Sequence, residues 1–368
     1  MATPAPLSRR SGPWQRRLAL GPALLAAALP TGCLDSAPEA DLPAPVPGVR
    51  IIGAPGTEPG LFVTPRAIAA DAHTLWVVDR SGRVQRLDPR TGRCIEFFWL
   101  TRSQRGYPTG LAVGPDAEGN PCLYLADTHE HRVLVYRVTP VDPAIIGRTD
   151  LRPAWEPTTP EPARVVGGFG TAPGQFTYPC DVAVLADHAG RAERFYVSEF
   201  GGQDRVTVFD ASWAPVRVIG GPGRPEDPDQ PRFTRPQSLA IDPAARELLL
   251  CDSINSRVGR LSLEGELIAW VTPRPGPEPE QAPLSHPRGI HAPGDGTALL
   301  AEFGGSRLRR LDLASGRVLG AWGAPGRQPG ALAEPWDLAV LDGTVYVTEG
   351  RNGRISASGD PGLWRPRR

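Results

Sequence analysis

The sequence predicts an all-β fold, a six-bladed β-propeller whose last blade is closed by an N-terminal strand. A short pattern of strands and turns recurs six times between Pro65 and Asn352, and successive copies begin 43 to 71 residues apart, as propeller blades do. The 43 prolines and 42 glycines sit between apolar runs, where turns join strands. The final copy lacks a fourth strand, which a segment ahead of the first copy can supply.

Each copy opens with a proline and a short apolar run that has a small residue at its centre. Small centres suit inner strands, which crowd around the axis of a propeller. The six prolines are Pro65, Pro108, Pro179, Pro236, Pro287 and Pro335. A second run, rich in β-forming residues, ends on an acidic residue in every copy. These runs are Leu75 to Asp79, Leu123 to Asp127, Phe195 to Glu199, Leu248 to Asp252, Ala298 to Glu302 and Val345 to Glu349.

An arginine follows each of these acids after a short turn. The six arginines are Arg83, Arg132, Arg205, Arg257, Arg307 and Arg354. A carboxylate that ends one strand can pair with a guanidinium that starts the next, and the pair then holds the register of both strands. Because the pair occurs in all six copies, we interpret it as architecture and not as a functional site.

Three stretches of this pattern resemble NHL repeats: YPTGLAV at 107–113, LADTHEHRV at 125–133 and GQFTYP at 174–179. The resemblance extends from residue 48 to the C-terminus and implies a six-bladed propeller. NHL-type propellers serve as peptide-binding scaffolds, as RNA-binding surfaces and, in a few cases, as frames for a lyase or hydrolase. The resemblance therefore predicts the fold and leaves the chemistry open.

The last copy supplies strands at 336–340, 345–349 and 354–357, after which the strand pattern stops. Near the other end of the domain, Val49 to Gly53 has the pattern of an outer strand such as Val216 to Gly220. We expect this N-terminal strand to complete the sixth blade, which leaves no large open sheet edge.

The first 33 residues have the layout of an export signal, with Arg9, Arg10, Arg16 and Arg17 ahead of an apolar stretch at 18–29. The ending at Cys33 resembles a bacterial lipoprotein lipobox and implies a diacylglycerol on that cysteine; an ordinary cleaved signal peptide is the alternative. We expect a signal peptide at 1–32, a Pro/Ala-rich tether at 33–47, the NHL-type propeller at 48–358 and a C-terminal tail at 359–368. The expected location is the cell envelope or periplasm, with a lipid anchor in the inner or outer membrane.

The charge balance disfavours nucleic acid as a partner, and the cysteines bear on disulfides and metal binding. Forty basic residues balance forty acidic ones, so no basic field favours nucleic acid as a partner. An oxidising compartment permits two disulfides among Cys94, Cys122, Cys180 and Cys251, and three connectivities remain open. No two of these cysteines have metal-ligand spacing. We expect Cys251 to be a small buried core residue.

If the repeated residues form the frame, function lies in residues that break the repeat. The two positions after each proline enter the inner strands, which line the central channel at one mouth. Six irregular residues at these positions are candidates for binding a ligand: Arg66, Asp181, Gln237, Arg288, Trp336 and Asp337. Charged, amide and indole groups that converge in this way suit a small anionic or sugar-like ligand, or a loop of a partner protein. In the alternative interpretation, the arginines and aspartates pair with one another across the channel.

Two further features lie outside the repeat. Phe200 and Phe303 each follow a repeat acid beside the same mouth, where they can contact a ligand or pack within turns. The proline-rich insertion from Thr139 to Ala163 suits neither a strand nor a helix, and we expect it to form an outer loop on blade two. Its Trp155 is a candidate contact for another protein.

We expect a non-enzymatic exported propeller that binds a protein or small ligand at the channel mouth, as an accessory to a cell-envelope complex. The alternative is a metal-assisted hydrolase or lyase that uses Asp181, Asp337 and an arginine with a divalent cation; no other cofactor is expected. Propellers of the peptide-amidating lyases resemble this family and hold zinc with three histidines. The six histidines of this chain do not recur at equivalent positions, so that ligand set is missing.

Overall fold

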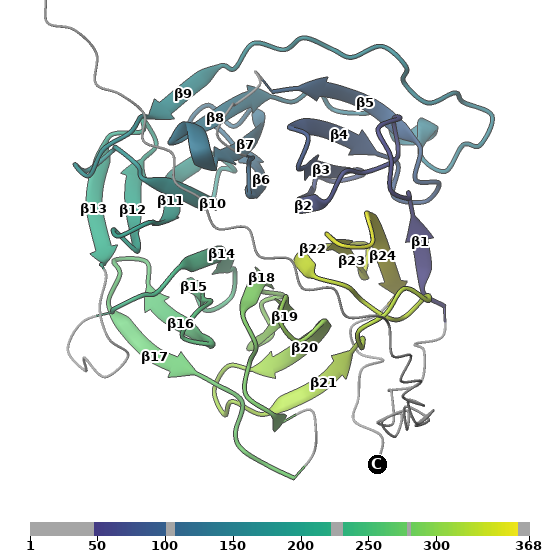
Figure 1. The fold of residues 1–368 in the computed structure, drawn as a ribbon. Helices are drawn as coiled ribbons and strands as arrows, with labels where there is room; N and C mark the ends of the chain where they lie inside the picture. The colour runs from purple at the N-terminus through teal and green to yellow at the C-terminus, as the bar shows by residue number, and fades with distance from the viewer. Residues whose placement is uncertain (1–47, 101–106, 222–230, 278–280, 360–368) are drawn as a thin grey trace, which may run out of the picture. The chain divides into compact units, whose positions relative to one another are not determined.

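The computed structural model describes residues 48–100, 107–221, 231–277 and 281–359. Six four-stranded antiparallel sheets follow one another around a central axis as the blades of a propeller (Figure 1). These residues contain two 3₁₀ turns, η1 (Thr128–Glu130) and η2 (Pro143–Ile145), and no helix among them could span a membrane. The expected signal peptide, the tether with Cys33 and residues 360–368 of the expected tail lie outside the described residues.

Each blade has four strands, which run in order from the axis outward. Blades one and two comprise β2 (Pro65–Ala70), β3 (Leu75–Asp79), β4 (Arg83–Leu87) and β5 (Cys94–Trp99), then β6 (Gly110–Pro115), β7 (Pro121–Asp127), β8 (Arg132–Arg137) and β9 (Arg164–Gly167). Blades three and four comprise β10 (Tyr178–Ala186), β11 (Ala192–Phe200), β12 (Arg205–Asp210) and β13 (Pro215–Gly220), then β14 (Pro236–Asp242), β15 (Glu247–Asp252), β16 (Arg257–Ser262) and β17 (Leu267–Val271). Blade five comprises β18 (Pro287–His291), β19 (Thr297–Glu302), β20 (Arg307–Asp312) and β21 (Val318–Trp322).

The sixth blade joins the two ends of the domain. It comprises β22 (Pro335–Leu341), β23 (Thr344–Glu349), β24 (Arg354–Gly359) and, as its outer strand, β1 (Arg50–Ile52). Strand β1 runs antiparallel to β24, and Ile51 is the register partner of Ser356. The prediction of an N-terminal closing strand is confirmed.

Apolar side chains fill the junctions between neighbouring blades. Successive side chains of a strand point to opposite faces of its sheet. On β3, Val77 therefore packs in the cluster shared with blade six, and Val78 packs in the cluster shared with blade two. Both side chains are fully buried, so each blade is stabilised by its two neighbours and not by a core of its own.

The repeated acids and arginines form ion pairs in all six blades, with N to O distances from 2.5 to 3.4 Å. In blade three the pair also holds the incoming chain. Glu199 accepts the Thr177 N–H at 2.7 Å, and Arg205 donates to the Thr171 carbonyl at 2.7 Å. The interpretation of these residues as architecture is confirmed, because all six pairs are formed and in blades one, three, four, five and six the acid also accepts a backbone N–H from the loop that enters its blade.

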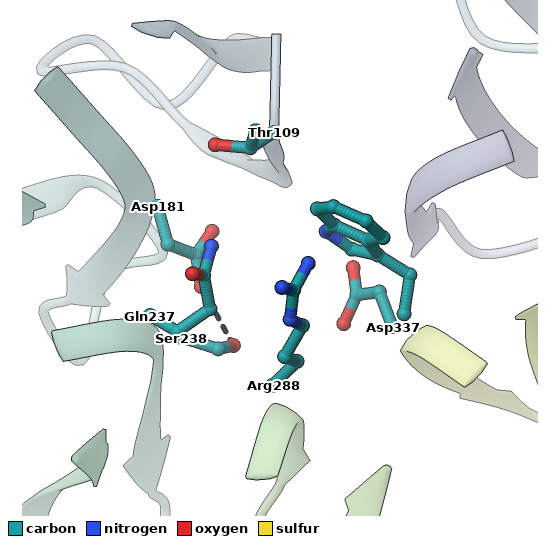
Figure 2. Close-up of a pocket in the computed structure, with 7 residues that line it drawn as sticks. Thr109, Asp181, Gln237, Ser238, Arg288 and Asp337 are labelled. Atoms are coloured by element: carbon teal, nitrogen blue, oxygen red, sulfur yellow. Dashed lines mark hydrogen bonds between the residues drawn. The ribbon is translucent and has the colours of Figure 1, made fainter. Parts of the chain in front are cut away.

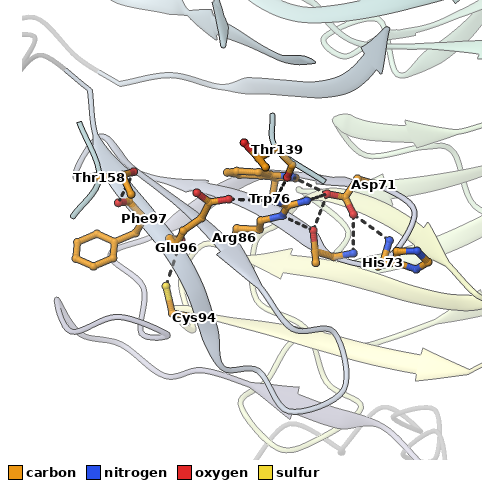
Figure 3. Close-up of polar contacts among 10 residues, drawn as sticks. Asp71, His73, Trp76, Arg86, Cys94, Glu96, Phe97, Thr139 and Thr158 are labelled. Carbon is orange, nitrogen blue, oxygen red and sulfur yellow. Dashed lines mark hydrogen bonds and ion pairs between the residues drawn. The ribbon is translucent and has the colours of Figure 1, made fainter. Parts of the chain in front are cut away.

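We expected the proline-rich insertion to form an outer loop on blade two, and this prediction is wrong. The insertion lies along the outer edge of blade one (Figure 3). Thr158 donates its backbone N–H to the Phe97 carbonyl at 2.8 Å, and the Thr139 carbonyl accepts a bond from Arg86. The insertion thus covers β5, whose free backbone groups would otherwise form an exposed sheet edge. Trp155 is 61% exposed, so it stays available to a partner.

The four cysteines of the described residues are free and buried, and they lie in four different blades. None of the disulfides that the sequence permits among these four is formed. Burial raises the pKa of Cys94 to about 12 and that of Cys122 to about 11, so these thiols are neutral at physiological pH. Cys251 is a fully buried core residue, as expected.

Candidate functional site

A pocket lies at the channel mouth where the inner strands begin (Figure 2). Seven residues line it: Thr109, Asp181, Gln237, Ser238, Arg288, Trp336 and Asp337. The space between their atoms is about 190 Å³, and part of it is open to solvent. Arg66 is not in the lining, but its guanidinium carbon lies 4.7 Å from the Trp336 ring centroid. The structure therefore places all six candidate residues at one mouth.

One aspartate in the pocket links three consecutive blades. The backbone of Asp181 on β10 lies so close to Gly110 that a Cβ on the glycine would come within 2.6 Å of the Asp181 Cα atom. On its other side, the Asp181 carboxylate accepts the Leu239 N–H at 2.9 Å and the Ser238 hydroxyl at 2.8 Å. Asp181 thus joins the inner strands of blades two, three and four.

The same arrangement recurs half a turn around the ring. Asp337 on β22 lies against Gly289, where a Cβ would come within 2.7 Å of the Asp337 Cα atom. Its carboxylate accepts the Ile68 N–H of blade one at 3.0 Å and the Leu338 N–H at 2.8 Å. A residue type that recurs at equivalent places with equivalent bonds is a structural element, so both aspartates belong to the frame as well as to the pocket wall.

Burial governs the ionisation of these two carboxyls. It raises the pKa of Asp181 to about 6, against the opposing effect of the hydrogen bonds that Asp181 accepts. Burial also raises the pKa of Asp337 well above its ordinary value, and the nearby charge of Asp181 raises it further. Their carboxylate oxygens are occupied by backbone N–H groups, which leaves them poorly placed to neutralise an arginine.

The two halves of the ring differ at the first position after each proline. In one half these residues are Thr109, Cys180 and Gln237; in the other they are Arg288, Trp336 and Arg66. The blades share one architecture, and the first half of the ring builds it without arginine or tryptophan at this position. The irregular half, with two guanidiniums and an indole, is therefore the part of the mouth with a candidate function.

Arg288 has no anionic partner among the described residues. Its guanidinium carbon lies 3.9 Å from the Trp336 ring centroid and 3.8 Å from that of Phe303, and Figure 2 shows it extending into the pocket. Its Nε and Nη1 atoms are buried, and no atom in the described ranges accepts a hydrogen bond from them. Burial, with the charges of Arg235 and Arg66, lowers the pKa of Arg288 to about 9.

Arg66 is in a similar state. Its Nε is buried without an acceptor from the described residues, and burial together with the charge of Arg80 lowers its pKa to about 10. Within the described part of the chain, neither Arg66 nor Arg288 forms an ion pair. The alternative interpretation, in which the arginines and aspartates pair across the channel, is thus wrong for the described residues, because backbone groups occupy the aspartate oxygens.

The structure adds cations and rings that the sequence analysis missed. Arg235 lies 4.7 Å from the Phe200 ring and donates its Nε to the Gln237 side chain at 3.3 Å. Arg80 lies 5.3 Å from the ring of Tyr107. Arg235 and Tyr107 each directly precede a repeat proline. The position before each proline was therefore a signal in the sequence that could have identified them. Phe200 and Phe303 do lie beside the mouth, each against an arginine.

No group of three or more histidine, cysteine or acidic side chains in the described ranges is arranged to hold a metal ion. His129 accepts the Tyr107 N–H at 3.2 Å, and the His131 ring lies 5.4 Å from that of Tyr178. Burial lowers the pKa of His291, which packs on the inner strand β18. These histidines are held by neighbours of the frame.

No protein-family model matches the sequence, and a search of the curated proteins returns no match. Solved structures do match. A protein of unknown function from Bacteroides thetaiotaomicron VPI-5482 has a TM-score of 0.55 at 17% identity, over 84% of this chain and 74% of that one. The chain is a six-bladed β-propeller.

Two other similar structures are lyases. A streptogramin B lyase has a TM-score of 0.50 at 14% identity, over 84% of this chain and 97% of that one. A catalytically inactive virginiamycin B lyase of Staphylococcus aureus, with quinupristin, has a TM-score of 0.50 at 12% identity, over 85% of this chain and 86% of that one. At such low identity the likeness shows a shared fold and says nothing of chemistry.

Proposed function

We propose that this protein is a non-enzymatic binding propeller of NHL type whose channel mouth binds a small anionic group, a carboxylate above all, on a ligand or a partner protein. The observation that carries the proposal is the state of Arg288: a guanidinium that faces a pocket, lies on two aromatic rings and has buried Nε and Nη1 atoms without acceptors among the described residues.

Physical chemistry favours an anion at this place. A buried charge without a counter-charge is costly, and an entering anion offsets that cost. A planar guanidinium binds a carboxylate through two parallel hydrogen bonds, which few other groups provide. The Trp336 indole adds another buried donor without an acceptor in the described part of the chain, so a second N–H can share the same anion.

The Trp336 indole N–H also provides a direct test. Its NMR signal, assigned by its loss in Trp336→Phe, should shift as acetate is added and should not shift with acetamide, which has the same shape and no charge. Replacing Arg288 with glutamine should weaken acetate binding roughly tenfold or more, since charge-assisted hydrogen bonds contribute about 1.5–3 kcal/mol each.

Arg137→Gln is the matched control for that experiment. Arg137 is 69% exposed and loosely paired with Asp116 at 3.9 Å, so its loss should leave acetate binding unchanged. Equal shifts with acetate and acetamide, or an Arg288→Gln protein that binds acetate as well as wild type does, would overturn the proposal. Inorganic phosphate and sulfate, run in parallel, show which anion the site prefers.

Export and membrane attachment belong to the same proposal. A signal peptide that ends at Cys33, with a lipid on that cysteine, would hold the propeller in the cell envelope as an accessory of an envelope complex. Replacing Cys33 with serine should move the protein from the membrane fraction to the soluble fraction of an expressing bacterium. Retention of Cys33→Ser in the membrane fraction would contradict the lipid anchor.

The second candidate is a metal-assisted hydrolase or lyase with Asp181, Asp337 and a divalent cation. The positive charges of Arg66 and Arg288 beside these carboxyls oppose a cation there, and the carboxylate oxygens already accept backbone N–H groups. Trace-metal analysis of purified protein separates the two candidates. A stoichiometric ion that disappears when both aspartates are changed to alanine would favour the enzyme.

A further inference from the structure

A row of aromatic rings leads from the outer rim of the mouth to the pocket. The Phe169 ring lies 4.8 Å from that of His131, His131 lies 5.4 Å from Tyr178, and Tyr178 stacks on Phe200 at 5.0 Å. Phe200 then contacts Arg235, whose Nε bonds the pocket residue Gln237. These four rings, which we call the rim row, are continuous with the anion pocket.

The outer end of the rim row is exposed to solvent. Phe169 is 73% exposed, the highest value among the large apolar side chains that the structure describes as exposed. An isolated exposed apolar side chain is ordinary, but this one continues a row of partly exposed rings that ends at the half-buried Arg235. Rigid aromatic rings give contact area at little entropic cost, which suits a binding surface.

Aromatic and cationic groups also continue from the rim row toward blade one, because the His129 ring lies 5.5 Å from Tyr178 and accepts the Tyr107 N–H at 3.2 Å. The Tyr107 ring lies 5.6 Å from the Arg66 guanidinium carbon and 5.3 Å from that of Arg80. A bound chain can therefore make contacts along this surface in addition to the group that enters the pocket. This favours a carboxylate carried by a polypeptide chain over a free small acid.

We propose that the occupant of this mouth is a loop of a protein partner that inserts one aspartate or glutamate side chain into the pocket and lays apolar residues on the rim row. This inference rests on the proposed function and names the partner class. The pocket is small and partly open to solvent, and the rim row adjoins it through Arg235 and Gln237, so a chain with one acidic side chain at the pocket can lay its neighbouring residues on the rings. The carboxylate would contact Arg288 and Arg66, and the flanking residues would contact Phe169 and Tyr178.

A phage library of disulfide-closed heptapeptides, selected on immobilised protein and counter-selected on Arg288→Gln, supplies the probe. The enriched peptides should carry an aspartate or glutamate with apolar or aromatic neighbours. Changing that acid to its amide should weaken binding of the synthetic peptide at least tenfold in fluorescence anisotropy. The protein variant Phe169→Ala should weaken peptide binding several-fold and leave acetate binding unchanged.

Trp155→Ala is the matched control, because Trp155 is 61% exposed on the insertion, against the outer edge of blade one. This variant should bind the peptide as wild type does. Enriched peptides without an acid, equal affinity in Phe169→Ala, or binding only by linear peptides with a free C-terminal carboxylate would overturn the inference. If acetate binds through Arg288 but no acidic loop is enriched, the inference falls and the proposed function stands; if acetate does not bind, both fall.

Discussion

The guanidinium carbon of Arg288 lies 3.9 Å from the centroid of the Trp336 ring, at the junction of blades five and six. An aromatic face stabilises a cation by about 0.5–2 kcal/mol, which only partly offsets the loss of its hydration. The contact therefore positions the Arg288 guanidinium beside the pocket and leaves its positive charge unneutralised. An arginine paired with Asp337 would be a closed structural unit, whereas this arginine retains its capacity to bind an anion.

Anion binding should depend on pH in the alkaline range. Burial and neighbouring cations depress the pKa of Arg288 to about 9 and that of Arg66 to about 10, so both are protonated at pH 7 and lose their charge as pH rises past these values. Acetate stays ionised throughout. The dissociation constant for acetate should thus be constant up to about pH 8 and rise by up to tenfold per pH unit above the pKa of Arg288.

The NMR titration of the Trp336 indole, repeated at several pH values, measures this dependence. In Arg288→Gln, the remaining weak binding should show no change near pH 9. A wild-type dissociation constant that stays flat to about pH 10.5, well past the pKa of Arg288, would mean that this arginine does not take part. The sign is fixed by the chemistry, because only the protonated guanidinium attracts the anion.

Gly289→Ala should disrupt the junction that carries Asp337. A Cβ at this position would meet the Asp337 Cα atom at 2.7 Å and the next backbone nitrogen at 3.1 Å, and backbone atoms cannot move aside cheaply. We expect a loss of about 1–3 kcal/mol in the free energy of unfolding, measured with urea. Gly359→Ala is the control, since no described atom lies within 4 Å of its added Cβ, and it should change stability by less than about 0.5 kcal/mol.

Ring closure by β1 should stabilise the whole propeller. Ile52 is 2% exposed and packs in the cluster between blades six and one, so Ile52→Ala should cost about 2–5 kcal/mol. Val218→Ala on the outer strand β13, where the side chain is 38% exposed, should cost far less. Internal deletion of residues 48–53 should lower stability in a single cooperative transition; an unchanged urea midpoint would show that the ring does not depend on this strand.

Removing the acid of a repeat pair should destabilise the protein far more than removing an acid on the surface. Glu349 is fully buried and accepts bonds from Arg354 at 2.8 Å and from the Ala333 N–H at 3.1 Å. Glu349→Ala leaves the partly buried Arg354 guanidinium without its carboxylate and should lower the free energy of unfolding by about 3–5 kcal/mol. Glu264→Ala removes an exposed partner of Arg194 and should cost at most about 1 kcal/mol. Equal urea midpoints for the two variants would contradict the structural role of the pair.

Local patterns predicted most of the frame, because blades are built from contacts that are close in sequence. The run Leu75 to Asp79 forms β3 with those bounds, and Arg83 begins β4 and pairs with Asp79. The outcome for the insertion shows the limit of this reasoning. Thr158 bonds Phe97, which is 61 residues away, and no pattern within the insertion indicates which blade it will cover.

The sequence by itself determined the number of blades, the acid and arginine pairs, the closing strand and the set of irregular residues after each proline, since each is a recurrence along the chain. Only the tertiary structure decided which irregular residues are free to act. Asp181 and Asp337 are held by backbone groups of the next blade, while Arg66 and Arg288 lie against aromatic rings and meet no carboxylate of the described residues. The physical reason is that hydrogen-bond satisfaction depends on neighbours across blade junctions, far apart in sequence, and repeat spacing carries no record of them.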